Sequence, residues 1–314
     1  MPRFTRIATF AVLSGLFLSA PALAGQRSFV ASYGNDANSA GGCVFANPCR
    51  SFTSALSVTD PGGEIVAIDA AGYGVVTITK SVTITANPGF YAGITASSGA
   101  TGVTINTGSI NVILRGLNIN GLAGSVKGVA ITAGATVTIE NCVISNFQNG
   151  VSLSNSSGRL RISDSVVRGN SEDGIYVENG GRADVYRTKV SGNALVGMHV
   201  NGDIATTTSR LMVSDSEATG NGIYGFLADV GAGGTGNARM SITRSTASFS
   251  GTSGIAAQSV DTGTVTLMLS SSAVSFNTTG IEQAGVAVFN SQGNNAVSVN
   301  TTNTAGTITA VGGT

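Results

Sequence analysis

Charge is scarce in this sequence, and neither sign is in excess. Charged residues make up 10% of the 314 positions, and 16 Lys and Arg balance 16 Asp and Glu. A general nucleic-acid-binding protein needs a basic surface, so this balance argues against that class. We therefore expect no nucleic-acid partner.

Aromatic residues are scarce as well, at 6% of the chain, and Trp is absent. Low charge and few aromatic residues are typical of disordered chains, but 42% of the residues here are hydrophobic, which excludes disorder. The chain is rich in Gly, with 44 residues, and in Ser, Thr, Asn and Val. This composition is typical of many short strands joined by tight turns.

Long hydrophobic runs are absent after the first 24 residues. Arg3 and Arg6 precede an apolar run over residues 7–20, and Ala22-Leu23-Ala24 resembles a signal-peptidase site. We expect residues 1–24 to be a cleaved export signal. The mature chain is expected in the periplasm or outside the cell, without a membrane span or lipid anchor.

Cysteine occurs three times. Cys43 and Cys49 lie six positions apart in a turn-rich segment, and an oxidising compartment favours a disulfide between them. A metal site is the alternative, although no His or further Cys lies nearby. Cys142 is left over, in a column otherwise held by Ser and Thr, which indicates a small buried thiol.

A short strand pattern recurs through the chain. Examples are Gly150-Val151-Ser152-Leu153, Gly174-Ile175-Tyr176-Val177 and Gly197-Met198-His199-Val200. Two further short apolar strands follow each of these, which is the pattern of one coil of a parallel β-helix. We predict an all-β, single-stranded right-handed solenoid of about nine or ten coils over residues 64–314. The coils begin at a series of glycines: Gly102, Gly128, Gly150, Gly174, Gly197, Gly225, Gly254 and Gly280.

Residues 25–63 do not repeat, and we expect them to form an N-terminal cap. Phe52, Ala55 and Leu56 share one face of a short predicted helix, which would cover the open end of the core. Asparagines recur at one turn of the coils and predict a ladder of side-chain hydrogen bonds. Its members are Asn170, Asn193, Asn221 and Asn277, with Phe147 and Ser250 as interruptions.

The export signal, the capped N-terminus, the Gly-Ile-x-Val coils and the Asn turn together resemble the right-handed parallel β-helix proteins of the pectin lyase-like superfamily. The resemblance covers essentially the whole mature chain. It implies the fold, but the superfamily includes lyases, hydrolases, epimerases, esterases, adhesins and tailspikes, so it does not imply one chemistry.

Outward positions of the middle coils gather polar side chains in one patch: Tyr176, Glu178, His199, Asn201 and Asp229. Elimination from a uronic acid needs a proton acceptor, a proton donor and a group that holds the carboxylate. Tyr176, His199 and Asn201 are the candidate catalytic residues, with Arg182 as a further carboxylate-binding group. The alternative is an ordinary polar surface.

A second column, on the next strand of each coil, contains four arginines between Thr136 and Thr264: Arg159, Arg182, Arg210 and Arg239. Guanidinium groups on successive coils would bind carboxylates, sulfates or phosphates bidentately, together with Glu178 and Asp229 as further ligand-binding residues. Asp184 and Glu178 would partly neutralise this column. The alternative is a solvated, salt-bridged face. A third column alternates in sign and predicts an ion-pair ladder: Asp164, Arg187, Asp215 and Arg244.

The motifs that mark epimerases, polygalacturonases and calcium-dependent pectate lyases are missing, and we expect no metal or cofactor. Two functions remain. The favoured one is an exported scaffold that binds an extended, acidic polysaccharide or a cell-surface ligand without catalysis. The other is a polysaccharide lyase, or another carbohydrate-active enzyme, acting on uronate-containing glycans.

Overall fold

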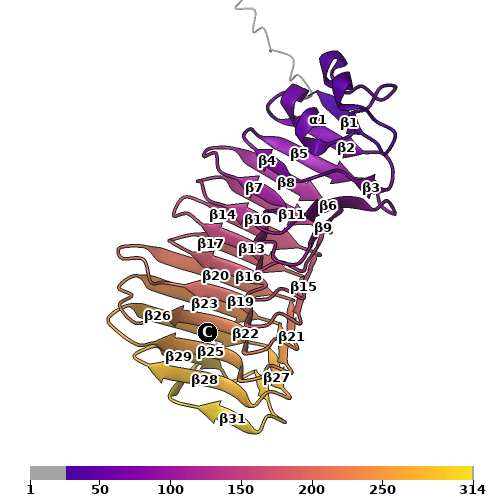
Figure 1. Ribbon diagram of the computed structural model, residues 1–314. Helices are drawn as coiled ribbons and strands as arrows, with labels where there is room; N and C mark the ends of the chain where they lie inside the picture. Colours follow the sequence, from indigo (N-terminus) through magenta and orange to yellow (C-terminus); the bar gives the residue numbers. More distant parts are fainter. Residues whose placement is uncertain (1–25, 313–314) are drawn as a thin grey trace, which may run out of the picture.

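The computed structural model describes residues 26–312 and shows a parallel β-helix built from three sheets (Figure 1). Every pairing between neighbouring strands is parallel, and two of the sheets contain 10 strands each. The predicted all-β solenoid and its number of coils are thereby confirmed. The predicted export signal lies outside the described residues.

We call the three sheets A, B and C. Along the chain, each coil contributes one strand to sheet B, then one to sheet C and then one to sheet A. Sheet A consists of β1 (Arg27–Val30), β2 (Gly63–Ala67), β5 (Val82–Ala86), β8 (Asn111–Arg115), β11 (Thr136–Glu140), β14 (Arg159–Ser163), β17 (Arg182–Tyr186), β20 (Thr208–Ser214), β23 (Asn237–Thr243), β26 (Thr264–Ser270), β29 (Val288–Gln292) and β32 (Ile308–Val311).

Sheet B consists of β3 (Ala71–Gly72), β6 (Ala92–Ala96), β9 (Leu117–Gly121), β12 (Val143–Ser145), β15 (Val166–Arg168), β18 (Lys189–Ser191), β21 (Glu217–Thr219), β24 (Thr246–Ser248), β27 (Ala273–Ser275) and β30 (Ala296–Val297). Sheet C consists of β4 (Val76–Ile78), β7 (Val103–Ile105), β10 (Lys127–Ile131), β13 (Asn149–Ser154), β16 (Ile175–Glu178), β19 (Val196–Asn201), β22 (Tyr224–Val230), β25 (Ser253–Ser259), β28 (Thr279–Gly285) and β31 (Thr302–Ala305).

Alternation along each strand produces the core. In β16, Ile175 and Val177 point inward and are fully buried, whereas Tyr176 between them faces outward. Residues paired on neighbouring coils then form continuous inner files, as predicted. One such file on sheet C is buried along its whole length: Val151, Ile175, Met198, Phe226, Ile255 and Ile281.

The leading glycines and the Asn turn have a common cause. Asn170 Nδ2 donates to Asn193 Oδ1 over 2.8 Å, and Asn193 Nδ2 donates to Asn221 Oδ1 over 2.9 Å. A Cβ added to Gly174 would lie 2.8 Å from Asn193 Nδ2 and 2.6 Å from the Gly197 carbonyl oxygen. Only glycine leaves room for the asparagine side chain at this strand start, and the same crowding occurs at Gly150, Gly197, Gly254 and Gly280. The predicted ladder is confirmed.

Ser250 interrupts this ladder, and its buried hydroxyl has no hydrogen-bond partner. Replacing it by Asn is expected to raise the free energy of unfolding by about 1 kcal/mol, because the new amide would continue the ladder between Asn221 and Asn277. Urea denaturation of the two proteins measures this. The reverse change, Asn193→Ser, is the control and should destabilise. A less stable Ser250→Asn protein would mean that the site has no room for the amide.

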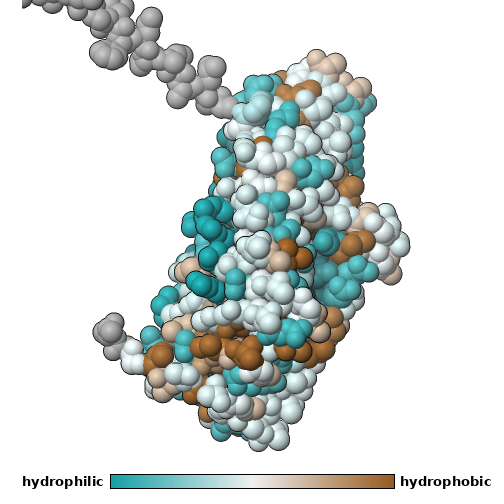
Figure 2. All heavy atoms as spheres, turned by 90° about the vertical axis from the view of Figure 1, so that its left-hand side faces the viewer, coloured by the Kyte–Doolittle hydropathy of each residue, from teal (hydrophilic) through white to brown (hydrophobic). Residues whose placement is uncertain are grey.

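The outer surface of the solenoid is not uniform. On the face shown in Figure 2, hydrophilic side chains gather around the middle coils and hydrophobic ones near the C-terminal end. The C-terminal coils also hold several strongly exposed apolar side chains. They are Phe249, Val260, Phe276, Val286 and Val299, each more than half exposed.

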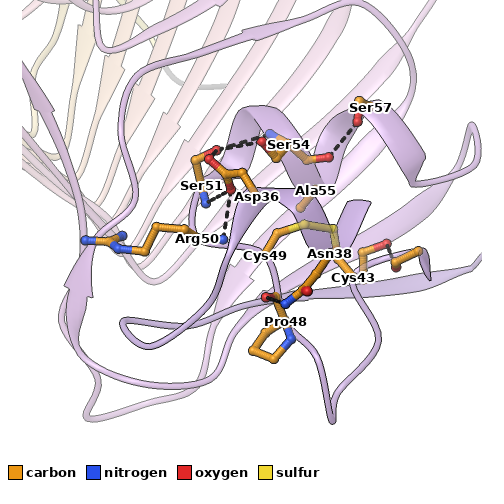
Figure 3. Close-up of a disulfide and its surroundings, with 12 residues drawn as sticks. Asp36, Asn38, Cys43, Pro48, Cys49, Arg50, Ser51, Ser54, Ala55 and Ser57 are labelled. Atoms are coloured by element: carbon orange, nitrogen blue, oxygen red, sulfur yellow. Dashed lines mark hydrogen bonds between the residues drawn. A yellow bond between two sulfur atoms is a disulfide. The ribbon is translucent and has the colours of Figure 1, made fainter. Parts of the chain in front are cut away.

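The N-terminal cap is fastened by the Cys43–Cys49 disulfide, as predicted (Figure 3). Beside it, α1 (Phe52–Val58) buries Phe52, Ala55 and Leu56 against the core, and Ser51 caps its first turn. The 3₁₀ helix η1 (Asp36–Gly41) begins with Asp36, whose carboxylate accepts bonds from the Arg50 and Ser51 backbone N–H groups. The cap also supplies β1, the first strand of sheet A.

Left-handed residues form the corner between sheets A and B: Asn141, Asp164, Arg187, Asp215, Arg244 and Ser271. Next to them, Cys142 is a buried thiol, as predicted, and burial raises its pKa to about 11. The predicted ion-pair ladder occurs as two separate pairs. Arg187 Nε lies 2.6 Å from Asp164 Oδ1, and Arg244 Nη2 lies 2.8 Å from Asp215 Oδ2. Both pairs are exposed, so each contributes little to stability.

Candidate functional site

The four predicted arginines lie in register on the outer face of sheet A. The pairs are Arg159 with Arg182, Arg182 with Arg210, and Arg210 with Arg239, from β14 through β17 and β20 to β23. Adjacent strands are ~4.8 Å apart, so the four side chains leave the sheet at that spacing, and Arg210 Nη1 donates to the Thr208 carbonyl oxygen over 3.1 Å. We call Arg159, Arg182, Arg210 and Arg239 the arginine column. Below it, Arg239 pairs with Thr266 and not with the predicted Thr264, because β23 and β26 both begin two residues before the column.

The arginine column has no internal counter-charge. None of its members forms an ion pair with a carboxylate among residues 26–312, whereas Arg27 and Arg115 on the same sheet each bind a glutamate. Burial lowers the pKa of Arg210, and the neighbouring charges of Arg182 and Arg239 lower it further. Like charges therefore lie side by side here without an ion pair to a described carboxylate.

A depression of about 400 Å³ lies over the arginine column. Its floor includes the next outward column of sheet A, with Asp184, Met212 and Ser241. A second depression of about 490 Å³ adjoins it, sharing Asp184 and Met212 and extending to Tyr186. Asp184 shares this depression with the arginines but makes no ion pair with a described residue, so its predicted partial neutralisation of the column stays a prediction.

The predicted catalytic residues lie on a different surface, the outer face of sheet C. Tyr176 pairs with His199 across β16 and β19, and Asn201 pairs with Asp229 across β19 and β22. His199 Nδ1 lies 2.8 Å from Asp173 Oδ2, and His199 Nε2 lies 2.9 Å from Asp229 Oδ1. The imidazole thus bridges two carboxylates from the coils on either side of it.

These contacts set the protonation of the cluster. Burial alone would lower the pKa of His199, but the hydrogen bonds of Asp173 and Asp229 and their negative charges raise it to about 9. The side chain of His199 is 13% exposed and is an imidazolium at neutral pH. Burial and the charge of Glu178 raise the pKa of the Tyr176 hydroxyl, which donates to Glu178 Oε2 over 3.2 Å.

The remaining contacts of this cluster are hydrogen bonds to neighbouring coils. Asn201 Nδ2 donates to Asp229 Oδ1 over 3.0 Å, and the Val196 N–H donates to Asp173 Oδ1 over 3.2 Å. Sequence reasoning did not identify Asp173, which stands just before the coil glycine Gly174. Its signal in the sequence would have been its position in the turn two residues before β16, from which its short carboxylate reaches the next coil.

The predicted elimination chemistry needs the candidate catalytic residues and the carboxylate-binding arginine in one site. Tyr176, His199 and Asn201 lie on sheet C, and Arg182 lies on sheet A. Glu178 and Asp229, predicted as ligand-binding residues, belong to the sheet C cluster and do not line the depression over the arginine column. Both ring nitrogens of His199 are engaged, so the imidazole has no free lone pair to accept a proton.

No group of three or more His, Cys, Asp or Glu within residues 26–312 is arranged to hold a metal ion. In the same part of the chain, no helix combines the length and apolar character needed to cross a bilayer.

Among solved structures, the chain is similar to pectate lyase Pel9A, with 17% identity, a TM-score of 0.64 and coverage of 85% of this chain and 78% of that one. The Dettilon tailspike protein follows with 15% identity, a TM-score of 0.48 and coverage of 83% and 65%. A rhamnogalacturonan lyase has 11% identity, a TM-score of 0.41 and coverage of 87% and 75%. At 17% identity, the likeness to pectate lyase Pel9A is one of fold.

No curated protein matches the chain by sequence. The sequence does match the family described as "Right handed beta helix region" twice, over residues 34–200 and residues 128–314. The two matches overlap and together cover nearly the whole chain. Because the coil is repeated, the same family model can match at more than one position along the chain. The chain therefore belongs to the right-handed β-helix family.

Proposed function

We propose that this protein is an exported β-helix scaffold whose arginine column binds an acidic polysaccharide without catalysis. The observation that carries the proposal is the in-register series of arginines that lack carboxylate partners among the described residues. Unpaired like charges repel one another, so such a column is costly unless an anionic ligand neutralises it. A uronate polymer supplies carboxylates at regular intervals along its chain.

Geometry supports an extended ligand. A guanidinium is a planar group that can bind a carboxylate through two hydrogen bonds, and four arginines in register on one sheet face can engage several sugars of one chain. Linked contacts of this kind gain affinity because the second carboxylate is already close when the first has bound. The depression over the column, with exposed Met212 in its floor, offers apolar area beside the charges.

The state of His199 supports a function without catalysis. Its two carboxylate contacts and its raised pKa leave an imidazolium that stabilises neighbouring coils, and the raised pKa of Tyr176 keeps that hydroxyl protonated. Neither group is then a base for proton abstraction near neutral pH. The sheet C cluster is accordingly proposed as structural.

Retention on immobilised polygalacturonate tests the binding function. We expect retention at low salt, release as the salt concentration rises, and weaker retention on the methyl-esterified polymer, which has the same sugars without the charge. Free passage through polygalacturonate at low salt would overturn the proposal. Equal retention on both polymers would show that the carboxylates are not what is recognised.

The alternative function is a polysaccharide lyase acting on uronates. One observation favours it: Arg210 lies in a depression and its pKa is lowered, which increases the fraction of neutral guanidine, the form that can accept a proton. Formation of an unsaturated uronate, followed by its ultraviolet absorbance, tests this. Product that is lost in Arg210→Ala and kept in Tyr176→Phe would replace the scaffold with an enzyme centred on sheet A.

A further inference from the structure

A column of left-handed residues forms the corner between sheets B and C. Every member follows the end of a sheet B strand and has a φ between 56° and 65°: Asn146, Gly169, Gly192, Gly220, Phe249, Phe276 and Val299. Three successive coils place glycine here, which adopts this conformation freely. The next three coils place Phe, Phe and Val, for which a positive φ is unfavourable.

These three bulky residues are more than half exposed, so they gain little from burial in return. Phe249 is 61% exposed, Phe276 is 54% exposed and Val299 is 64% exposed. Apolar side chains that are both strained and exposed are not explained by the packing of the solenoid, and such strain is concentrated at functional sites.

The two rings form a flat stack. Their centroids are 5.1 Å apart and their planes differ by 5°. Because one face of Phe249 packs on Phe276, its other face points toward the preceding coil, which holds Gly220 at this corner. A Cβ added to Gly220 or to Gly192 would meet nothing within 4 Å. The free face of Phe249 therefore borders open space next to the glycines of the preceding coils.

A hollow with a polar lining runs alongside the stack. A depression of about 470 Å³ is lined by Phe249, Phe276 and Val299 together with Ser250, Asn277, Thr278 and Thr301. Its lining has hydroxyl and amide groups and no charged side chain. Flat apolar rings next to uncharged hydrogen-bonding groups match a sugar ring, which has one apolar face and a rim of hydroxyls.

We propose that Phe249 and Phe276 form a stacking site for the pyranose rings of a neutral glycan segment. Stacking needs no carboxylate, and the site lies at the B–C corner, whereas the arginine column lies on sheet A. The proposal is therefore independent of the function proposed for that column. A glycan is favoured over a second copy of this chain because the apolar strip is one residue wide on each coil and has a polar rim.

Titration calorimetry with hexaoses of β-1,4-linked glucose, galactose and mannose tests the site. Wild type is expected to bind at least one of them, and Phe249→Gly/Phe276→Gly is expected to lose at least tenfold in affinity. Glycine suits the left-handed φ of both positions, so this variant should fold, and thermal unfolding verifies that. The control Phe90→Ala removes an exposed aromatic ring elsewhere and should bind like wild type.

The Arg182→Ala/Arg210→Ala variant separates this proposal from the previous one, because it should bind the neutral hexaose unchanged. Absence of binding to all three hexaoses by wild type would overturn the stacking site. So would unchanged affinity in the double glycine variant. A concentration-dependent dimer of wild type that disappears in the double glycine variant, without hexaose binding, would assign the strip to a second copy of the chain.

Discussion

Replacing His199 by alanine is expected to lower the free energy of unfolding by about 3–5 kcal/mol, because it leaves two carboxylates without their common partner. Asp173 and Asp229 are only 10% and 22% exposed and lie on either side of the imidazole. Urea denaturation at pH 7 measures the change. The control Lys189→Ala removes a cation from an exposed ion pair with Glu217 and should cost less than about 1 kcal/mol.

The same contacts make the stability of wild type depend on pH. The pKa of His199 is about 9 in the folded protein and about 6.5 in an unfolded chain. The stabilisation is therefore complete below pH ~6.5 and is lost as the pH rises through about 9, with a total of about 3 kcal/mol. His199→Ala should lack this alkaline loss. An equal loss in both proteins would show that His199 is not its source.

Replacing Arg182 and Arg210 together by alanine is expected to weaken binding to oligogalacturonate at least about 100-fold. Each arginine is assigned a charge-assisted bidentate contact of roughly 1.5–3 kcal/mol, and about 1.4 kcal/mol corresponds to tenfold in affinity. Stability without ligand should not fall, because the change removes repulsion within the arginine column. Calorimetric titration and thermal unfolding measure the two effects.

The matched control for this variant is Arg27→Ala/Arg115→Ala. Both residues are on sheet A, and each is paired with a glutamate, Glu64 or Glu140. The control removes the same number of charges, so it should lower affinity only slightly through the overall field. An equal loss in both variants would show that binding follows net charge and not the arginine column.

The sequence predicts the solenoid well because its signals are local and repeated. Inward Ile175 and Val177 alternate with outward Tyr176, and corresponding residues alternate in the same way in the strands of neighbouring coils. This two-residue period is sufficient to define the inner face. The Asn193 turn and the Gly174 strand start repeat together because the amide occupies the space that a Cβ on glycine would fill. Constraints of this kind appear in the sequence as columns.

The candidate site is predicted less completely. The repeat in the sequence shows which residues stack on successive coils, but not which of the stacked outward residues lie on the same sheet. Tyr176, His199 and Arg182 are close in sequence, yet a change of sheet separates the arginine from the other two. The role of Asp173 depends on a side chain that reaches across coils from a turn, which no strand period encodes. Phe249 and Phe276 stand at turn positions, where the unusual φ becomes evident only from the backbone.

The ion-pair column shows the same limit. Asp164, Arg187, Asp215 and Arg244 alternate in sign, but Arg187 uses both Nε and Nη2 on Asp164, and Arg244 does the same with Asp215. Neither guanidinium forms a second ion pair with a described carboxylate, so the column divides into pairs. Sequence spacing correctly predicts which charged residues lie on neighbouring coils, but it cannot predict which carboxylate each guanidinium binds.

The arginine column is tested most directly by a crystal structure of the protein with a short oligogalacturonate. We predict that the sugar lies across β17 and β20, with its carboxylates bound by the guanidinium groups of Arg182 and Arg210. Oligogalacturonate bound on another face, with the arginine column free of it, would contradict the account.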